Sequence, residues 1–401
     1  MTIRILCLAL LACACTGNIS LGEKGLLSQA GISGSELGGT LATGGVLLTG
    51  GVGSISDMGM GGTLATGGAI ETGVPTSGKP FAASIAAAQG QTCALLNDGS
   101  LRCWGKAAWG ANAVKNTVPV LVSSVTGAVS LSSPSYGFYA ILQAGTVQGL
   151  WNAVAPAQVP NITNALTVAA GESFSCALLD NGLVQCWKDG SGSVTTPVTV
   201  RNISNATAIS VEGCTWQACA VLSSGVVQCW DSRNSGQLGN GTTTDSSTPV
   251  TVAGVTNATA VSVGCNNRCV VLDTGQVQCG ADGTTQIPNI TNAVAVSVDG
   301  ITNADDISDG GKHACALLRD GTIRCWGGNG SGQLGNGTTA NSDAPVTVSN
   351  ITDATAVSVG AAYSCAIVNN GSISCWGDNQ SGELGDGTST NSSVPVTVVG
   401  F

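Results

Sequence analysis

A ten-residue spacing between cysteines recurs along this chain and constrains its fold more than any other feature of the sequence. Self-similarity at a period of 20 to 50 residues is typical of solenoids, propellers and arrays. The chain should therefore be built from one small unit that is used several times. Six pairs share the spacing: Cys93 and Cys103, Cys176 and Cys186, Cys219 and Cys229, Cys269 and Cys279, Cys315 and Cys325, and Cys365 and Cys375.

An Ala-x-x-aliphatic motif marks the start of each unit. The first cysteine of a pair follows this alanine by eleven residues, or by thirteen in the fourth unit, and in the second unit Tyr139 and Gly149 stand in the two cysteine positions. Seven units then fill residues 81–401. They begin at Ala82, Ala128, Ala165, Ala206, Ala258, Ala304 and Ala354.

The centre of each unit reads as a β-hairpin. Between Cys315 and Cys325, apolar residues flank the three-residue turn Arg319-Asp320-Gly321, with glycine where a positive φ is needed. A three-residue loop at this point places the two cysteines directly opposite each other. The Ala-x-x-aliphatic stretch and a Pro-Val-x-Val stretch, as at Pro345, supply two further strands. Four short strands, repeated seven times, predict an all-β, seven-bladed β-propeller.

Three glycine-rich stretches then carry a family resemblance. Residues 325–337 read CWGGNGSGQLGNG, residues 375–387 read CWGDNQSGELGDG, and residues 235–241 read SGQLGNG. These stretches, with the segment around His313, resemble the repeats of the regulator of chromosome condensation family. The resemblance covers residues 81–401 and implies a seven-bladed propeller, in agreement with the repeat count.

The cysteine pairs are expected to be cross-strand disulfides. A zinc site would need close CxxC pairs or several histidines, and the sequence has one histidine and no CxxC pair. Free buried thiols that act as small apolar packing residues are the alternative. Cys214 and Cys265 belong to adjacent units and are expected to pair with each other.

The first fifteen residues form a separate segment that reads as an export signal. Arg4 precedes the uncharged apolar run Ile5 to Ala14, which is too short to span a bilayer. The run ends in LLACAC, which resembles a bacterial lipoprotein box. Leu10 favours Cys13 as the lipidated cysteine, whereas cysteine parity favours Cys15. Neither cysteine is followed by Asp, and in the lipoprotein family that pattern implies the outer membrane, with the protein facing the periplasm or the cell surface.

Residues 16–80 are predicted to be a disordered tether. Nineteen of the 64 residues from Gly17 to Pro80 are glycine, and the string GGTLATGG occurs twice. Such a segment cannot bury enough apolar surface to offset its chain entropy. As a flexible coil it would extend about 45 Å end to end.

Charge and composition exclude several functions. With 13 Lys and Arg against 23 Asp and Glu, the chain lacks the basic footprint of a nucleic-acid-binding protein. No catalytic set stands out, and no metal or cofactor is expected. His313 has a structural role in this interpretation, because other units place Gln91, Phe174 or Tyr363 in the same position. The Trp residues that follow the hairpin cysteines are interpreted as packing residues.

The function expected from this architecture is non-enzymatic recognition. The protein should be a membrane-anchored, extracytoplasmic scaffold whose loops bind a protein or a glycan. An exported inhibitor of a cell-wall or β-lactam enzyme is the alternative, since propellers that resemble this family include β-lactamase inhibitory proteins. The expected binding residues lie at the tips of the three longest loops. They are Thr242 and Ser247, Thr338 and Ser342, and Thr388 and Ser392.

Ring closure is expected from the last strand. The stretch that begins at Pro395 has no following unit, and the first unit has no Pro-Val-x-Val stretch before it. The C-terminal strand is therefore predicted to complete the first blade and so remove an open edge.

Membrane attachment gives the first testable prediction. The wild-type chain should sediment with membranes, and replacing the lipidated cysteine (Cys13→Ser or Cys15→Ser) should release it, because each buried acyl methylene contributes about 0.8 kcal/mol. Cys7→Ser, which lies inside the apolar run, is the matched control and should stay bound. A wild-type protein that is wholly soluble, with no acyl mass at its N-terminus, would contradict the assignment.

Overall fold

The computed structural model describes the propeller region almost completely. The described residues are 57–59, 62–64, 80–106, 115–132, 137–150, 156–171, 174–190, 193–211, 216–231, 238–242, 244–264, 268–280, 283–298 and 313–401. The chain divides into two units, Met1–Gly50 and Gly51–Phe401, and every described strand belongs to the second. Cys13, Cys15, Cys214 and Cys265 lie outside the described residues, so the expectations for them stay predictions.

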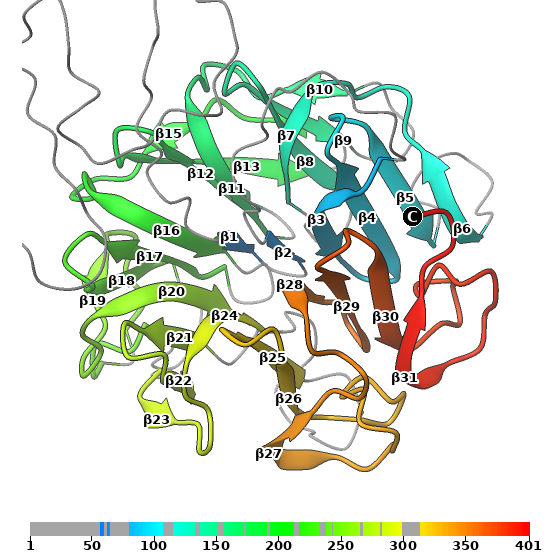
Figure 1. Cartoon of the computed structure of the whole chain (residues 1–401). Helices are drawn as coiled ribbons and strands as arrows, with labels where there is room; N and C mark the ends of the chain where they lie inside the picture. Colours follow the sequence, from blue (N-terminus) through cyan, green and yellow to red (C-terminus); the bar gives the residue numbers. More distant parts are fainter. Residues whose placement is uncertain are drawn as a thin grey trace, which may run out of the picture. The chain divides into compact units, whose positions relative to one another are not determined.

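Seven antiparallel sheets follow one another along the chain, and each is made from one continuous stretch (Figure 1). In every sheet, which we call a blade, the four main strands are hydrogen-bonded in chain order. The third blade carries one additional short strand, β14 (Ser193–Val194), paired with the end of its third strand. This arrangement confirms the predicted all-β, seven-bladed propeller.

The four main strands occur in the same order in all blades. First strands are β3 (Ala82–Ala87), β7 (Ala128–Ser132), β11 (Ala165–Ala170), β16 (Ala206–Val211), β20 (Ala258–Val263), β24 (Ala293–Val298) and β28 (Ala354–Val359). Second strands are β4 (Gln91–Leu96), β8 (Phe138–Leu142), β12 (Phe174–Leu179), β17 (Ala218–Leu222), β21 (Arg268–Leu272), β25 (His313–Leu318) and β29 (Tyr363–Val368). Third strands are β5 (Leu101–Gly105), β9 (Val147–Leu150), β13 (Val184–Gly190), β18 (Val227–Trp230), β22 (Val277–Gly280), β26 (Ile323–Gly327) and β30 (Ile373–Gly377). Fourth strands are β6 (Asn116–Leu121), β10 (Ala157–Gln158), β15 (Val198–Thr199), β19 (Val250–Thr251), β23 (Thr285–Gln286), β27 (Ser342–Thr347) and β31 (Ser392–Thr397).

The hairpin and disulfide predictions are confirmed. Cys315 lies directly opposite Cys325 across β25 and β26, and the turn between Leu318 and Thr322 has three residues. The same register pairs the cysteines of the other five blades that carry them, and all six pairs are disulfide-bonded. Each disulfide therefore fixes the two central strands of one blade.

A glycine in each hairpin turn forms the junction with the next blade. At every junction the first-strand alanine donates its N–H to the carbonyl of the preceding blade's hairpin glycine, as from Ala258 to Gly225 at 2.9 Å. These glycines have positive φ, and a Cβ on any of them would lie 2.5 to 3.1 Å from the residue before that alanine. Only glycine allows so close an approach. We call this contact the glycine seam. Its glycines are Gly99, Gly145, Gly182, Gly225, Gly275, Gly321 and Gly371.

The glycine seam also closes the ring, and the predicted closure by the C-terminal strand is wrong. The residue Val396 of β31 lies opposite Cys375 of its own blade, and the first blade is completed by β6. The last and first blades meet by the same contact as the others, with Ala82 N–H bonded to the Gly371 carbonyl at 2.9 Å. Fourth strands pair within their own blade because a direct loop joins each of them to its third strand.

The sixth unit begins at Ala293, and the prediction that it begins at Ala304 is also wrong. Ala293 lies opposite Leu318, just as Ala354 lies opposite Val368 in the last blade. Residues 299–312, which lie outside the described residues, separate β24 from β25. The motif at Ala304 falls within this insertion, so it matched the expected spacing by coincidence.

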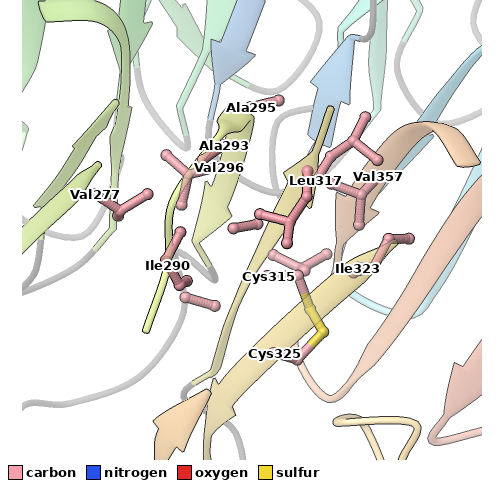
Figure 2. Close-up of a cluster of buried hydrophobic side chains, with 14 of the residues drawn as sticks. Val277, Ile290, Ala293, Ala295, Val296, Cys315, Leu317, Ile323, Cys325 and Val357 are labelled. Atoms are coloured by element: carbon pink, nitrogen blue, oxygen red, sulfur yellow. A yellow bond between two sulfur atoms is a disulfide. The ribbon is translucent and has the colours of Figure 1, made fainter. Parts of the chain in front are cut away.

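The apolar core lies between neighbouring blades. Figure 2 shows side chains from three consecutive blades packed together, including Val277 of β22, Val296 of β24 and Val357 of β28, with the Cys315–Cys325 disulfide among them. Because both faces of an inner blade are covered, its strands are apolar or small on both sides.

A short antiparallel pair from the predicted tether lies against the first strands. It consists of β1 (Asp57–Gly59) and β2 (Gly62–Leu64). The strand β1 contacts β11, β16 and β20, and β2 contacts β3, β7 and β28 (Figure 1). The strands β1 and β2 therefore occupy the space that the first strands surround.

Candidate functional site

In the last two blades the glycine-rich signature loops contact the following blade. The Gln333 carbonyl accepts hydrogen bonds from Trp376 Nε1 at 2.8 Å and Ser364 Oγ at 3.1 Å, both on the following blade. In the last loop the Glu383 carbonyl accepts the equivalent bonds from Trp104 Nε1 at 2.7 Å and Thr92 Oγ1 at 3.0 Å. The signature thus encodes a contact between blades.

A buried asparagine organises each of the two best-defined loops. Asn329 accepts the N–H of Leu334 at 2.9 Å and donates to the carbonyls of Thr338 and Ala340. Asn379 accepts the N–H of Leu384 in the same way. The loop leucines are fully buried, so they act in packing.

The predicted binding residues are spread over three blades. Their hydroxyls are largely used within their own loops: Thr338 and Thr388 bond Asn336 and Asp386, Ser342 and Ser392 bond nearby carbonyls, and Thr242 bonds Asn240. Of the six, Ser247 lines a cleft between the third and fourth blades.

His313 is a contact between blades. It is 3% exposed, and its Nε2 lies 2.7 Å from Ser364 Oγ on the next blade. Since that hydroxyl donates to the Gln333 carbonyl, Nε2 carries the proton and donates to the hydroxyl. Burial lowers the pKa of His313 to about 3, so the ring is neutral at physiological pH.

The tryptophans that follow the hairpin cysteines are buried, which confirms their interpretation as packing residues. Their exposed fractions are 7% or less in every case: Trp104, Trp187, Trp230, Trp326 and Trp376. The acidic group Asp305, Asp306 and Asp309 lies outside the described residues. Within the described ranges, no cluster of three or more His, Cys, Asp or Glu side chains could hold a metal ion. The same part of the chain contains no helix long and apolar enough to cross a membrane.

A cleft with a volume of about 700 Å³ lies between the third and fourth blades. We call it the inter-blade cleft. One side comes from β12, β13 and the residues that lead into β15, and the other from Trp216 and the loop after β18. Its lining consists of Phe174, Cys186, Trp187, Lys188, Thr195, Thr196, Val198, Trp216, Asp231, Asp245, Ser246 and Ser247.

Aromatic side chains form the apolar part of the inter-blade cleft. Trp216 is half-buried, and its ring centroid lies 6.4 Å from that of Phe174, with the planes tilted by 33°. Trp187, at 2% exposure, donates from Nε1 to the Tyr139 hydroxyl at 3.0 Å and is fixed behind them. Phe174 and Lys188 are direct cross-strand partners on β12 and β13.

Opposite charges and hydroxyls form the polar part. Lys188 Nζ lies 5.9 Å from the Trp216 ring centroid, within cation–π range. Burial raises the pKa of Asp231, and the positive charge of Lys188 opposes that shift. The Asp231 N–H donates to the Ser246 carbonyl at 2.7 Å, which holds the two ends of the loop together.

Two residues of the inter-blade cleft have an unusual backbone. Trp216 has φ of 58° and Asp231 has φ of 60°. A positive φ is costly for a bulky residue and is often found at functional sites. Glycine or asparagine occupies most other positive-φ positions in the described residues, so Trp216 is an exception.

The repeat pattern of the sequence does not mark Trp216, Phe174, Lys188 or Asp231 as site residues. One signal for them was present in the sequence. In the fourth unit the first cysteine of the pair, Cys219, follows the first alanine by thirteen positions rather than eleven, and Trp216 lies within this longer stretch. A departure from the repeat, rather than the repeat itself, marked the site.

Comparisons with known proteins agree with this architecture. Residues 320–367, and residues 305–333 and 354–383, match the regulator of chromosome condensation repeat. Among curated protein sequences, no significant relative was found.

Solved structures of other propellers resemble the fold. Prp20p from Saccharomyces cerevisiae, described with its binding properties to Gsp1p and histones, has 16% identity and a TM-score of 0.57 over 80% of this chain and 87% of that one. A structure of Kap60 bound to yeast RCC1 (Prp20) gives 15% identity and a TM-score of 0.60 over 90% of this chain and 91% of that one. Human WBSCR16 gives 16% identity and a TM-score of 0.55 over 71% of this chain and 85% of that one.

The fold and its neighbours define a class: a seven-bladed β-propeller. Within that class, the matched repeats at residues 305–383 and the signature loops support the regulator of chromosome condensation repeat family.

The buried His313 predicts an acid sensitivity. Its pKa is lower in the folded chain than in the unfolded chain, so the stability it contributes is complete above about pH 6.5 and is lost as the pH falls toward 3. Relative to His313→Gln, which copies Gln91 of the first blade, the wild type should lose up to about 1.4 kcal/mol per pH unit in this window. Urea unfolding from pH 7 to pH 4 measures the difference. Parallel pH profiles for the two proteins would contradict the assigned neutral histidine.

Proposed function

We propose that this protein is a non-enzymatic, lipid-anchored binding module that faces the periplasm or the cell surface and recognises its partner through the inter-blade cleft. The observation that carries the proposal is the cleft itself. It combines an aromatic wall with a polar rim in a volume of about 700 Å³, within the range of small-ligand sites.

The location of the cleft supports a binding role. In each blade, the connections from first to second strand and from third to fourth strand lie on one rim, opposite the glycine seam. Trp216 and the loop after β18 therefore belong to the rim opposite the glycine seam. Binding residues are commonly found on such loops, because a rigid framework positions them while their sequence varies.

Two further observations bear on the compartment and on the partner. Six disulfides are formed within the propeller, and disulfides persist in oxidising compartments. The formal net charge of −10 disfavours a nucleic-acid partner. The partner is then a protein or a glycan of the envelope, as the sequence indicates.

The test is retention of envelope components by the purified full-length chain. Ser247→Trp should fill the inter-blade cleft and reduce retention at least about tenfold, because a ligand group would lose its space. Ser224→Trp makes the same substitution at an exposed position in the hairpin turn of the same blade, on the opposite rim, and is the matched control, expected to retain normally. Equal retention by Ser247→Trp and the wild type, or no retained component at all, would contradict the proposal.

A further inference from the structure

The chemistry of the inter-blade cleft points to one class of ligand. We propose that the cleft binds a neutral saccharide, with one sugar ring stacked on the Trp216 indole and its hydroxyls bonded to the polar rim. This inference rests on the proposed binding function and assigns the ligand of that same site.

The aromatic wall provides a flat apolar surface of fixed orientation. Phe174 of the third blade is 7% exposed and packs beside the half-buried Trp216 ring of the fourth blade. Trp216 itself is held at φ of 58°, a conformation that the surrounding structure must impose. An amphipathic aromatic side chain that is fixed but only half-buried is suited to contact a ligand with one apolar face.

The rim provides hydrogen-bonding groups on the other side. Asp245 and Ser247 line the cleft, and neither side chain has a hydrogen-bond partner among the described residues. Asp231 adds a second carboxylate, and Thr196 a further hydroxyl. Carboxylates accept hydrogen bonds and hydroxyls both donate and accept, so together they match the alternating donors and acceptors of a sugar.

The charges in the cleft favour a neutral ligand. Lys188 already lies over the Trp216 ring, so a cationic group stacked there would meet like charge. An anionic group would meet the Asp231 and Asp245 carboxylates on the rim. A ligand without net charge avoids both costs.

A peptide ligand fits this site less well. Peptides that bind in extended form usually add a strand to an exposed sheet edge. The fourth strands beside the cleft, β15 and β19, each have only two residues. That length offers too little edge for strand addition.

The test uses the full-length chain on an array of neutral oligosaccharides with gluco, galacto, manno and N-acetylated configurations. At least one of them should bind, and Trp216→Asn should weaken that binding at least tenfold. Asparagine removes the ring but tolerates positive φ, as at Asn257 and Asn289, so the variant should keep its fold. Phe81→Asn is the matched control and should bind as the wild type does. It removes a 48%-exposed aromatic outside the cleft, at a position where other blades carry Asn164 or Asn257.

The outcomes separate this inference from the function on which it rests. If no saccharide binds, while Trp216→Asn and Ser247→Trp still abolish retention of an envelope component, the saccharide assignment is overturned and the binding module stands. If a saccharide binds the wild type and Trp216→Asn equally, the stacking site is overturned. A melting temperature within a few degrees of the wild type confirms that each variant is folded.

Discussion

The close backbone contact at the glycine seam is the constraint on which the rest of the structure depends. At Gly225 an added Cβ would lie 2.6 Å from Asn257 Cα, and at Gly275 it would lie 2.5 Å from Asn292 Cα. The hydrogen bond from the first-strand alanine can form only because the two backbones approach this closely. Since the seam between the last and first blades is the same as the others, the ring closes without a strand shared between the chain ends.

The two rims of the blades have different roles. One rim holds the hairpin turns and joins the blades. The other holds longer loops, and in the last two blades these loops also connect neighbours, through the Gln333 and Glu383 carbonyls. Between the third and fourth blades that second rim departs from the pattern, with the additional strand β14 and a longer stretch before β17. The inter-blade cleft forms at this departure.

Local pattern predicted the blades well and the junctions poorly. The cysteine spacing and the three-residue turn determined the hairpin register, because both act within about ten residues. The start of the sixth unit was wrongly predicted at Ala304. An insertion between β24 and β25 happens to contain the motif at the expected distance from Cys315, whereas the first strand begins at Ala293. The closure was misassigned because a count of strands does not show which strand each one pairs with. Trp216 of the fourth blade meets Phe174 and Lys188 of the third only after the two blades pack together, and no spacing within one unit reports those contacts.

The most direct test is a comparison of an alanine substitution at a seam glycine with one at a positive-φ glycine that has open space around it. Gly225 and Gly127 both have positive φ, so replacing either by alanine costs similar backbone strain, but only the Gly225 site lacks space for a Cβ. Urea unfolding should show Gly225→Ala less stable than Gly127→Ala by about 1 to 3 kcal/mol, the usual cost of overpacking. Equal stabilities would mean that the blades do not depend on close approach at the hairpin glycines, and would contradict the central role of the seam.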